Sequence, residues 1–456
     1  MDSVTELQRR IEDGYRARTR RSAALFDRAI RSLPGGDTRS ALFYPPYPTF
    51  MRSGLGCRLT DVDGNEYLDF LNNYTSLVHG HAHPSIVAAI TGQVAKGSAH
   101  GAPVELQIAL AEAIARRVPS VERLRFANSG TEAVLNAIRA ARAFTGRSKI
   151  LKMEGGYHGT YDAVEVSVDP GAEPPPWPQG RPEGPGLSPG LTGEVMVAPF
   201  NDLERASDLI ARCRDELAAV IVEPVLGAAG MIPAERAFLA GLREATAAYG
   251  VLLILDEVVT FRLAVGGAQE LFAVRPDLTT FGKVIGGGLP VGAFGGRADV
   301  MELFDPRRSK HIPQSGTFNG NAATLAAGLE TLELLTGEAI ARINAQGAAL
   351  RASLQAALEA AGARGQVTGL GSLSHVHFTD RPVRDYRSAA RGRRPTLWRC
   401  LHLALMNRGL FVAPRGMFIT STPMSDGDVQ AATTRFGEAL AELRPLLAGS
   451  RLGAAA

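Results

Sequence analysis

The sequence predicts an α/β protein with a mainly parallel sheet covered by helices, together with a smaller α+β domain. Two patterns lead to this prediction. From residue 84 onward, helical stretches alternate with short apolar strands, and after residue 321 longer helices are mixed with a few short strands. Each helix in such an alternation returns the chain across the sheet, so successive strands run parallel and both faces are covered. The 456 residues are enough for two or three domains.

The N-terminal region is predicted to contain a helix, a loop and a hairpin. Residues 4–32 carry an apolar stripe, so we expect one amphipathic helix that ends before Pro34. In the next stretch, GDTRSALFYPPYPTF, the prolines forbid a regular central strand, which predicts an ordered aromatic loop around Arg39. In CRLTDVDGNEYLDF, alternating residues flank Asp63 and Gly64, which is the pattern of a β-hairpin.

The central region supplies the predicted sheet. Helices are expected at 84–96, 104–117 and 131–144. The expected strands are Arg123–Phe126, Lys149–Met153, Glu194–Val197, Ala219–Val222, Val251–Leu255 and Leu278–Phe281. Residues 169–193 are so rich in proline and glycine that we expect neither helix nor strand there. This insert either edges a binding site or is a surface excursion, and the sequence leaves both open.

The C-terminal region predicts the smaller domain. Helices are expected at 321–335, 337–361, 396–407 and 425–447, and strands near 364–378 and 410–413. We therefore expect three parts: residues 1–70 as a first piece of the small domain, residues 71–330 as the large, ligand-binding domain, and residues 331–456 as the rest of the small domain. The alanine-rich end, RLGAAA, is expected to fray.

Composition argues against several classes of function. The net charge is only +3, from 49 basic and 46 acidic residues, so it provides no argument for binding nucleic acid or a membrane surface. Cys57, Cys213 and Cys400 lie far apart, which suggests neither a disulfide framework nor a metal site. No apolar run approaches the roughly 18 to 20 residues needed to span a bilayer, and the N-terminus lacks a hydrophobic signal segment. We expect a cytoplasmic protein that acts on small molecules.

Two ionisable groups follow predicted strands. Asp256, with Glu257 beside it, comes directly after Val251–Leu255, at the edge where open α/β sheets bind ligands. Lys283 follows Leu278–Phe281 and precedes three glycines that leave its amine uncrowded. Pyridoxal phosphate chemistry needs such a pair, because a lysine holds the cofactor as a Schiff base and a carboxylate keeps its ring nitrogen protonated. Either residue alone is explained equally well by a helix cap or a turn, but together they favour a cofactor site.

A candidate phosphate site lies earlier in the chain. Ser129, Gly130 and Thr131 stand between a predicted strand and a predicted helix. Backbone N–H groups and hydroxyls converge at such a turn, and the helix dipole favours an anion there. A simple helix cap by Ser129 is the alternative interpretation.

Six motifs in the same order resemble a known family. They are NSGTEA at 128–133, GGYHG at 155–159, EPV at 223–225, DEVVT from 256, DLTTFGKVIGGGLPVGAFGG from 277 and SGTFNGN at 315–321. Together they resemble the class III (ω-type) aminotransferases, which are fold-type I enzymes dependent on pyridoxal 5'-phosphate. The motifs extend over most of the chain.

The resemblance implies a role for several residues. Lys283 and Asp256 would be catalytic, with Tyr157 stacked on one face of the cofactor ring and His158 beside it. Val258 would press on the opposite face, since it lies two residues along the strand from Asp256. Glu223 would lie near the ring oxygen, and Thr317 would bind the phosphate of the other subunit. The last role implies a homodimer with its active site at the interface.

Two arginines outside this set suggest the substrates. A guanidinium gives a carboxylate two parallel hydrogen bonds, so Arg39 and Arg415 are candidate carboxylate ligands or members of structural ion pairs. Within the family, SALFYPPYP after Arg39, the absence of glycine after Thr260 and GGRADVMELFDPR resemble β-amino acid aminotransferases that act on β-phenylalanine. In that group the first arginine binds the β-amino acid and the second binds the acceptor.

The resemblance therefore implies transfer of an amino group from an aromatic β-amino acid to a 2-oxo acid such as 2-oxoglutarate or pyruvate. Tyr44, Tyr47 and Tyr74 are candidate aromatic walls for the donor. One alternative is glutamate-1-semialdehyde 2,1-aminomutase, which has an arginine where this chain has Leu42. A noncatalytic protein that binds pyridoxal phosphate is the other alternative.

Overall fold

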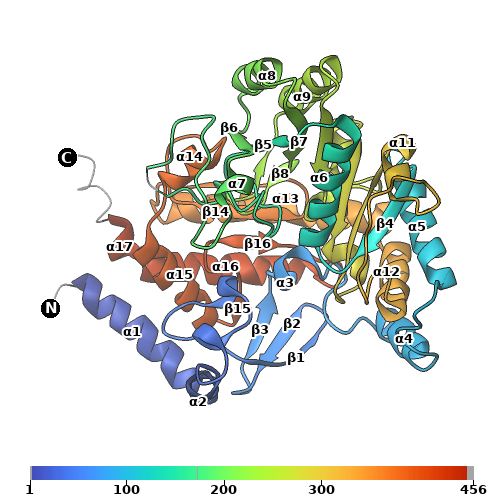
Figure 1. The fold of residues 1–456 in the computed structure, drawn as a ribbon. Helices are drawn as coiled ribbons and strands as arrows, with labels where there is room; N and C mark the ends of the chain where they lie inside the picture. Colours follow the sequence, from blue (N-terminus) through green and yellow to red (C-terminus); the bar gives the residue numbers. More distant parts are fainter. Residues whose placement is uncertain (1–2, 172, 449–456) are drawn as a thin grey trace.

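A seven-stranded sheet lies at the centre of the computed structural model, which describes residues 3–171 and 173–448 (Figure 1). The strand order is β4 (Arg123–Ala127), β12 (Gly292–Gly296), β11 (Leu278–Gly282), β10 (Leu252–Asp256), β7 (Leu217–Val222), β5 (Lys149–Met153) and β6 (Val195–Ala198). Neighbouring strands from β11 to β6 are parallel, and β12 is antiparallel to both of its neighbours. The predicted fold class is confirmed.

Strand β12 is not predicted from the sequence, because its residues, GAFGG, lack the bulky side chains typical of strands. Its glycines allow close backbone approach. A Cβ at Gly292 would collide with the backbone of Ser129, and one at Gly296 would collide with the backbone of Asp277. The missing side chains therefore let β12 run directly beside the predicted phosphate turn.

Alternating residues of the central strands face opposite layers of helices. Leu252 and Ile254 of β10 pack in the cluster that contains α6 (Gly130–Thr145). Leu253 and Leu255 point the other way, into the cluster with α8 (Leu203–Arg212) and α9 (Arg236–Ala248). Further along that face lie α4 (Pro84–Val94), α5 (Glu105–Arg117) and α12 (Ala322–Leu334). A strand apolar on both sides is what a sheet buried between two helical layers requires.

The two ends of the chain build the second part of the molecule together. Strands β1 (Met51–Leu55), β2 (Arg58–Asp61) and β3 (Glu66–Asp69) form a sheet with β15 (Leu410–Phe411), and β2 and β3 make the predicted hairpin. A second sheet contains β13 (Gln366–Thr368), β14 (Leu373–His377) and β16 (Met417–Ile419). Helices α13 (Gly337–Ala360), α15 (Pro395–Asn407) and α16 (Asp426–Glu442) cover these sheets. Figure 1 shows the N-terminal elements in blue beside the C-terminal ones in red.

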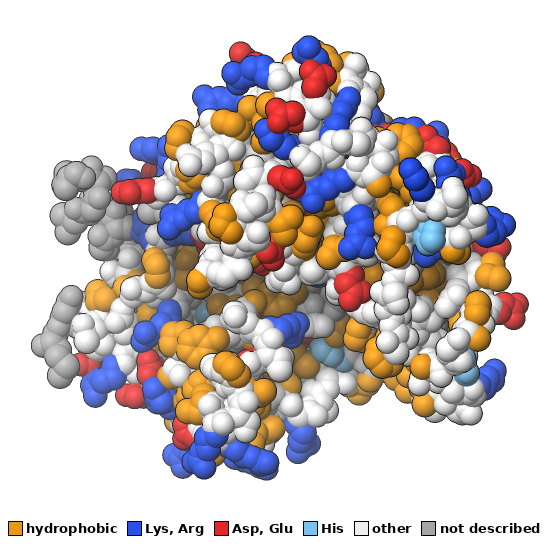
Figure 2. Space-filling view, in the orientation of Figure 1, with side chains coloured by type: hydrophobic (Ala, Val, Ile, Leu, Met, Phe, Trp, Pro, Cys, Tyr) orange, Lys and Arg blue, Asp and Glu red, His pale blue; other side chains and the backbone are white. Residues whose placement is uncertain are grey.

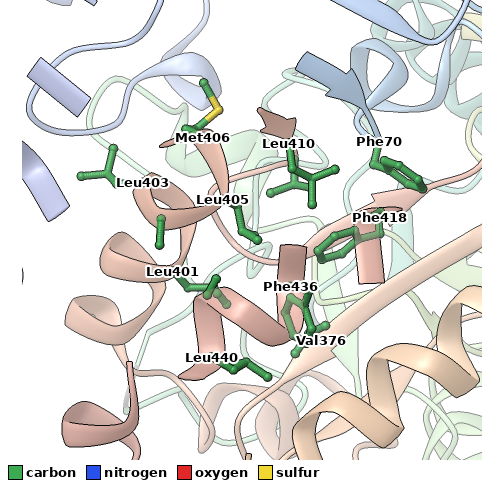
Figure 3. Packing of buried hydrophobic residues seen from close by; sticks show 14 of the residues in the cluster. Phe70, Val376, Leu401, Leu403, Leu405, Met406, Leu410, Phe418, Phe436 and Leu440 are labelled. Atoms are coloured by element: carbon green, nitrogen blue, oxygen red, sulfur yellow. The ribbon is translucent and has the colours of Figure 1, made fainter. Parts of the chain in front are cut away.

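Aromatic side chains from distant parts of the sequence close this second core. Phe70 from the N-terminal region packs on Phe418, with ring centroids 6.3 Å apart, and Phe418 packs on Phe436 of α16 (Figure 3). All three side chains are fully buried. On the face in Figure 2, a hollow with hydrophobic and histidine side chains in its depth separates this part from the part that holds the large sheet.

Two of the predicted helices are broken in the structure. The segment at 4–32 forms α1 (Ser3–Arg18) and α2 (Arg20–Ala29), because Thr19 leaves the helical conformation with φ −122° and ψ 40°. The carboxylate of Asp63 then accepts hydrogen bonds from the backbone N–H groups of Arg21 and Ser22, at 2.6 and 3.0 Å. A distant cap of this kind has no local sequence signal.

The segment at 425–447 likewise divides into α16 and α17 (Arg444–Ala448), and the predicted fraying of RLGAAA lies outside the described residues. The remaining short elements are α3 (Asn72–Thr75), α7 (Pro189–Thr192), β8 (Val225–Leu226), β9 (Ile232–Pro233), α10 (Ala268–Phe272), α11 (Ala298–Met301) and α14 (Tyr386–Ala390). Because α7 lies within 169–193, the expectation that this insert contains no helix was wrong for one short turn. Among the described helices, none is long and apolar enough to cross a membrane.

Candidate active site

Three neighbouring parallel strands deliver three ionisable side chains to one edge of the sheet. Glu223 directly follows β7, Asp256 ends β10, and Lys283 directly follows β11. Because the carboxyl ends of parallel strands meet at one edge, residues far apart in sequence become neighbours there. The charges of Asp256 and Glu223 both act on the amine of Lys283. The sheet itself therefore assembles the pair that the sequence predicts.

Lys283 is held in an uncommon conformation. Its φ is +48°, in the left-handed region that side chains other than glycine rarely adopt. It opens a short 3-10 turn, Lys283–Gly286, and is partly buried. Burial lowers the pKa of its amine below the ordinary lysine value, while Asp256 and Glu223 act in the opposite direction. A strained backbone conformation and a lowered amine pKa at the same residue are typical of a functional lysine.

Asp256 is bound by a buried histidine. Its Oδ2 lies 2.8 Å from Nδ1 of His158, and its Oδ1 accepts a hydrogen bond from the backbone N–H of Val258 at 3.1 Å. Because an ionised carboxylate only accepts hydrogen bonds, Nδ1 of His158 carries the proton. Burial lowers the pKa of His158, so the neutral ring is favoured. Its Nε2 is buried without a hydrogen-bond partner among residues 3–171 and 173–448.

The acidic pair Asp256-Glu257 divides between two tasks. The Oε2 and Oε1 atoms of Glu257 accept hydrogen bonds from the backbone N–H groups of Ala268 and Gln269, at 2.9 and 2.8 Å. Glu257 thus satisfies the start of α10, as an ordinary helix cap does. Asp256 instead faces His158, on the side of Lys283. Glu257 is therefore the helix cap that the sequence allowed, and Asp256 is the carboxylate of the candidate site.

Glu223 closes the third side of the site. Its Oε2 accepts a hydrogen bond from the backbone N–H of Tyr157 at 2.9 Å, and its Oε1 accepts one from Gly227 at 3.2 Å. Burial raises the pKa of Glu223 to about 8, and the negative charge of Asp256 acts in the same direction. Glu223 therefore fixes the turn that carries Tyr157, whose ring is 43% exposed beside the site.

The predicted phosphate turn is also a helix cap. Ser129 precedes α6, and its Oγ accepts a hydrogen bond from the backbone N–H of Glu132 at 3.1 Å. Thr131 Oγ1 accepts one from the backbone N–H of Thr160 at 3.1 Å. Gly130 stays partly exposed at the start of a long helix, which is the arrangement that favours an anion. The cap and the anion site are therefore compatible in one turn.

Val258 forms the floor between this turn and the lysine loop. A Cβ on Gly130 would lie 3.3 Å from Val258, and one on Gly282 would lie 3.4 Å from it. The strand ends at Asp256, so the expectation that Val258 continues it was wrong. Its position follows from the turn that the Val258 N–H makes with Asp256 rather than from strand alternation.

A buried lysine of this region was missed by the sequence analysis. Lys152 of β5 is fully buried, and its Nζ donates hydrogen bonds to the carbonyl oxygens of Gly156 and Val166, at 2.9 and 2.5 Å. Burial lowers its pKa to about 8. The available signal was a charged residue inside the apolar strand KILKM, at a position expected to be buried. Lys152 holds the turn that presents Tyr157 and His158.

The first arginine lies next to Tyr74. Arg39 donates a hydrogen bond from Nη1 to Oδ1 of Asn73 at 3.1 Å, and the hydroxyl of Tyr74 donates one to the carbonyl of Ala41 at 2.7 Å. Burial raises the pKa of the Tyr74 hydroxyl, and the charges of Arg39 and Arg415 both act to lower it. The structure therefore places both arginines close enough to Tyr74 for their charges to act on its hydroxyl.

Backbone strain marks the same place. Asn72, Asn73, Tyr74 and Thr75 all have positive φ, at 51, 46, 53 and 77°. Four such residues in a row are costly and need support from their surroundings. Asp69 provides some, because its Oδ1 accepts hydrogen bonds from the backbone N–H groups of Leu71 and Asn72 at 2.8 and 2.9 Å. These four positions contain no glycine, so the sequence carries no signal that predicts the turn.

The second arginine lines a cavity of about 370 Å³. Arg415 is exposed, and its Nη1 lies 3.7 Å from Oδ2 of Asp169, the first residue of the insert at 169–193. Asp169 is held firmly, because its Oδ1 accepts hydrogen bonds from the Tyr386 hydroxyl and from Arg393, both at 2.6 Å. The insert therefore reaches this cavity through Asp169.

The other two tyrosines behave differently. Tyr47 is buried in the core of the small sheets, where its carbonyl accepts a hydrogen bond from the hydroxyl of Tyr15 at 2.9 Å. It does not line the cavity beside Arg415, and its role as an aromatic wall for the donor stays a prediction. Tyr44 does line that cavity, although its hydroxyl already accepts a hydrogen bond from the backbone N–H of Thr49 at 2.9 Å.

Thr317 lies on an exposed turn after β12. Its neighbour Asn319 accepts a hydrogen bond from Nδ2 of Asn128 at 2.7 Å, which ties this turn to the start of the phosphate turn. Phe318 is 59% exposed, and Ile108 of α5, beside the same turn, is 60% exposed. The assignment of Thr317 to the phosphate of a second subunit stays a prediction.

Comparison with known proteins agrees with the site. The family described as aminotransferase class-III matches residues 41–440. The chain belongs to the class III aminotransferase family. The match includes the strand ends that hold Glu223, Asp256 and Lys283, and it extends through both sheets of the second part. The protein is a pyridoxal phosphate-dependent aminotransferase with the fold-type I architecture.

Individual relatives of this class III aminotransferase differ in their activity. It is 42% identical to glutamate-1-semialdehyde 2,1-aminomutase of Methanothermobacter thermautotrophicus, over 86% of this chain and 92% of the relative. It is 40% identical to β-phenylalanine transaminase of Variovorax paradoxus, over 95% of each chain. The crystal structure of an ω-transaminase from Sphaerobacter thermophilus superposes with a TM-score of 0.90 and 47% identity, covering 93% of this chain and 98% of that one.

Proposed function

We propose that this aminotransferase moves the amino group of an aromatic β-amino acid, such as β-phenylalanine, to a 2-oxo acid such as 2-oxoglutarate or pyruvate. The observation that carries the proposal is that Arg39 and Arg415 both lie close enough to Tyr74 for their charges to act on its hydroxyl. Two guanidinium groups offer places for a donor carboxylate and an acceptor carboxylate, and a phenol ring near both suits an aromatic donor. The similarity to a β-phenylalanine transaminase over 95% of the chain supports the choice.

The residues of the site fit pyridoxal 5'-phosphate. Nε2 of His158 is a buried polar atom that lacks a partner within the described chain, and Gly130 and Gly282 keep side chains away from the floor made by Val258. Lys283 would hold the aldehyde carbon, and Asp256 would face the ring nitrogen. Tyr157 would cover one ring face and Val258 the other. The phosphate would be held by Ser129, Gly130 and Thr131 of one subunit together with Thr317 of the partner subunit. Glu223 and His158 would lie beside the ring.

Different residues of the chain carry different steps of the proposed reaction. When bound, pyridoxal phosphate supplies an electron-withdrawing ring that stabilises negative charge on the amine-bearing carbon. Lys283 would take the proton from that carbon and deliver it to the C4′ carbon of the cofactor, because burial lowers the pKa of its amine and keeps more of it unprotonated near neutral pH. His158 holds Asp256 in place through the 2.8 Å contact, so the negative charge stays aligned for a cationic ring nitrogen.

The substrate side of the site selects by charge. Arg39 would bind the carboxylate of the β-amino acid, and its link to Asn73 fixes the direction of its guanidinium. Arg415 would bind the carboxylate of the oxo acid. Its ion-pair partner Asp169 lies 3.7 Å away, and no shorter contact commits the guanidinium within the described part of the chain. An arginine held this loosely is free to exchange one carboxylate for another.

A homodimer completes the proposed site. Ile108 borders a cavity of about 670 Å³ that also involves β4, and Phe318 is exposed on the turn whose residues Gly316 and Asn319 line that cavity. Large apolar side chains at this exposure are favourable places for a second subunit to pack. We place the enzyme in the cytoplasm, which suits its free cysteines.

One other function is supported by a specific observation. The 42% identity to a glutamate-1-semialdehyde 2,1-aminomutase favours an intramolecular amino transfer. Leu42 argues against it, because that group has an arginine at the matching place after Pro-Gly-Gly.

Single half-reactions separate these functions. The enzyme is mixed in turn with β-phenylalanine, glutamate-1-semialdehyde and 4-aminobutyrate, and bleaching of the visible absorbance of the cofactor is followed. We expect rapid bleaching with β-phenylalanine, and full recovery of the band when 2-oxoglutarate or pyruvate is added. Rapid reaction with glutamate-1-semialdehyde alone would establish the aminomutase instead. A protein that binds the cofactor but bleaches with none of the three amines would be a noncatalytic binder.

A further inference from the structure

The cavity beside Arg415 contains features that the proposed reaction does not use. It extends away from Arg415 along α15 and is bounded by the insert and by the loop that follows Arg39. Its walls include the aromatic rings of Phe43, Tyr44 and Trp398. At about 370 Å³ it has the size of an ordinary small-molecule site.

Two buried histidines line this cavity with unused polar atoms. His402 is 3% exposed, and neither of its ring nitrogens has a hydrogen-bond partner among residues 3–171 and 173–448. His375 is 9% exposed, and its Nδ1 is likewise unpaired within those residues. Burial lowers the pKa of both rings, to about 3 for His402, so both are neutral near pH 7. A neutral imidazole has one donor and one acceptor, and leaving both unused in the interior is unfavourable.

Four arginines line the same cavity, and they differ in whether their guanidinium groups already have hydrogen-bond or ion-pair partners. Arg393 donates a hydrogen bond to Asp169 at 2.6 Å, and Arg399 forms an ion pair with Glu12 at 2.9 Å. Arg394 has no side-chain hydrogen bond or ion pair in the described part of the chain, and Arg415 has the long contact to Asp169. With four guanidinium groups and a single carboxylate among its lining residues, the cavity favours an anion.

We propose that this cavity is a binding site for an aromatic carboxylate whose ring carries a hydroxyl group. The ring packs between the aromatic walls, the carboxylate faces the uncommitted guanidinium groups of Arg394 and Arg415, and the hydroxyl pairs with one of the two unused ring nitrogens of His402. His402 is well placed to receive a ring, because it already packs edge-on against Tyr44 with centroids 4.4 Å apart.

This site deepens the proposed function, because Arg415 belongs to both. A ligand in the cavity occupies the guanidinium that would bind the oxo acid, so it competes with the acceptor. Aromatic carboxylates are also the class to which the deaminated products of aromatic β-amino acids belong. Binding itself needs no turnover, so the two proposals are tested by separate measurements.

The chain provides its own reporter. It contains two tryptophans, Trp177 and Trp398, and Trp398 lines the cavity. In a Trp177→Phe variant of the holoenzyme, fluorescence therefore reports on Trp398. We expect a saturable change with 3-phenylpropanoate and with 3-(4-hydroxyphenyl)propanoate, and none with acetate or 3-phenylpropan-1-ol at the same concentrations. No saturable change with either aromatic acid, or an equal change with acetate, overturns the proposal.

Matched variants test each contact. Arg394→Met is expected to weaken binding of both aromatic acids by about 10-fold, the usual effect of losing a charged hydrogen bond. Arg399→Met is the control, because the guanidinium of Arg399 is already paired with Glu12, and it is expected to change binding by less than about twofold. Equal effects of the two variants would mean that only the general positive charge matters, which contradicts a built carboxylate site.

The hydroxyl contact is tested by measuring two ligands, with and without the hydroxyl, on two proteins, with and without His402. The hydroxylated acid is expected to bind about 5-fold more tightly than 3-phenylpropanoate, as a neutral hydrogen bond provides. His402→Leu is expected to remove this difference while leaving the binding of 3-phenylpropanoate nearly unchanged. Retention of the cofactor absorbance shows that the variant is folded. A preference that survives in His402→Leu overturns the role of His402. Bleaching of the cofactor by β-phenylalanine, measured separately, tests the transaminase itself.

Discussion

Nδ1 of His158 lies 2.8 Å from Oδ2 of Asp256, and both side chains are buried at the carboxyl edge of the sheet. The contact joins a residue of the turn after β5 to the last residue of β10. It fixes the carboxylate that the proposed mechanism aligns with a cationic ring nitrogen. Removing the histidine should therefore affect the cofactor before it affects the fold.

His158→Leu is expected to weaken retention of pyridoxal phosphate and to lower turnover by about 10- to 100-fold, as is typical for residues that orient a ligand to a reactive centre. The cofactor absorbance after dialysis and the rate of the β-phenylalanine half-reaction measure the two effects. Tyr161→Leu, a nearby change on a partly buried ring outside the site, serves as the control. Unchanged cofactor retention in His158→Leu would contradict the assigned role.

Lys283→Ala is expected to abolish turnover while the protein remains soluble and keeps its oligomeric state. The lysine supplies the base that moves the proton, and the other buried lysine of this region, Lys152, is committed to the carbonyl oxygens of Gly156 and Val166. The rate of amino transfer and the elution volume on size exclusion measure both properties. Amino transfer at the rate of the natural enzyme would refute the assignment of the base.

Arg39→Ala is expected to raise the free energy of the transition state with β-phenylalanine by about 1.5 to 3 kcal/mol, the usual contribution of a charged hydrogen bond. The measurement is kcat/KM for β-phenylalanine, with Arg52→Ala as a control on an exposed arginine of β1. If the kinetics with β-phenylalanine do not change, Arg39 lies outside the donor site.

Asp169→Asn is expected to lower KM for the oxo acid by about two- to fivefold, because the competing carboxylate beside Arg415 loses its charge. Tyr386→Phe removes a hydrogen bond to Asp169 but keeps its charge, so this control should leave KM nearly the same. A higher KM in Asp169→Asn would show that Asp169 positions Arg415 for the acceptor rather than competing with it.

Glu223 predicts a dependence of stability on pH. In the folded protein without cofactor its pKa is raised to about 8 from the ordinary 4.5. Between these values the unfolded chain is ionised while the folded protein keeps the proton, so the folding contribution of Glu223 declines as pH rises through this window. Glu223→Gln lacks this decline. Its melting temperature, relative to that of the natural protein, should therefore increase from pH 4.5 to pH 8, and a constant difference would contradict the raised pKa.

Much of the fold and of the site could be predicted from local sequence. The apolar runs of β10 and β7 are explicit, and the motifs around Asp256 and Lys283 place both residues at strand ends. Errors arose where a distant residue decides the local conformation. Asp63 caps the start of α2 after the break at Thr19, and β12 is a strand because its glycines fit beside the Ser129 turn.

By itself, the sequence determined the strands of the central sheet other than β12 and the identity of the reactive side chains, because hydrophobic periodicity and short motifs are local properties. Only the tertiary structure decided which charges meet. In the folded chain His158 contacts Asp256, and Asp169 of the insert lies beside Arg415. Asp69 accepts a hydrogen bond that supports the strained turn at Tyr74. Those contacts depend on the lateral order of the strands and on the packing of the two chain ends, which no local pattern encodes.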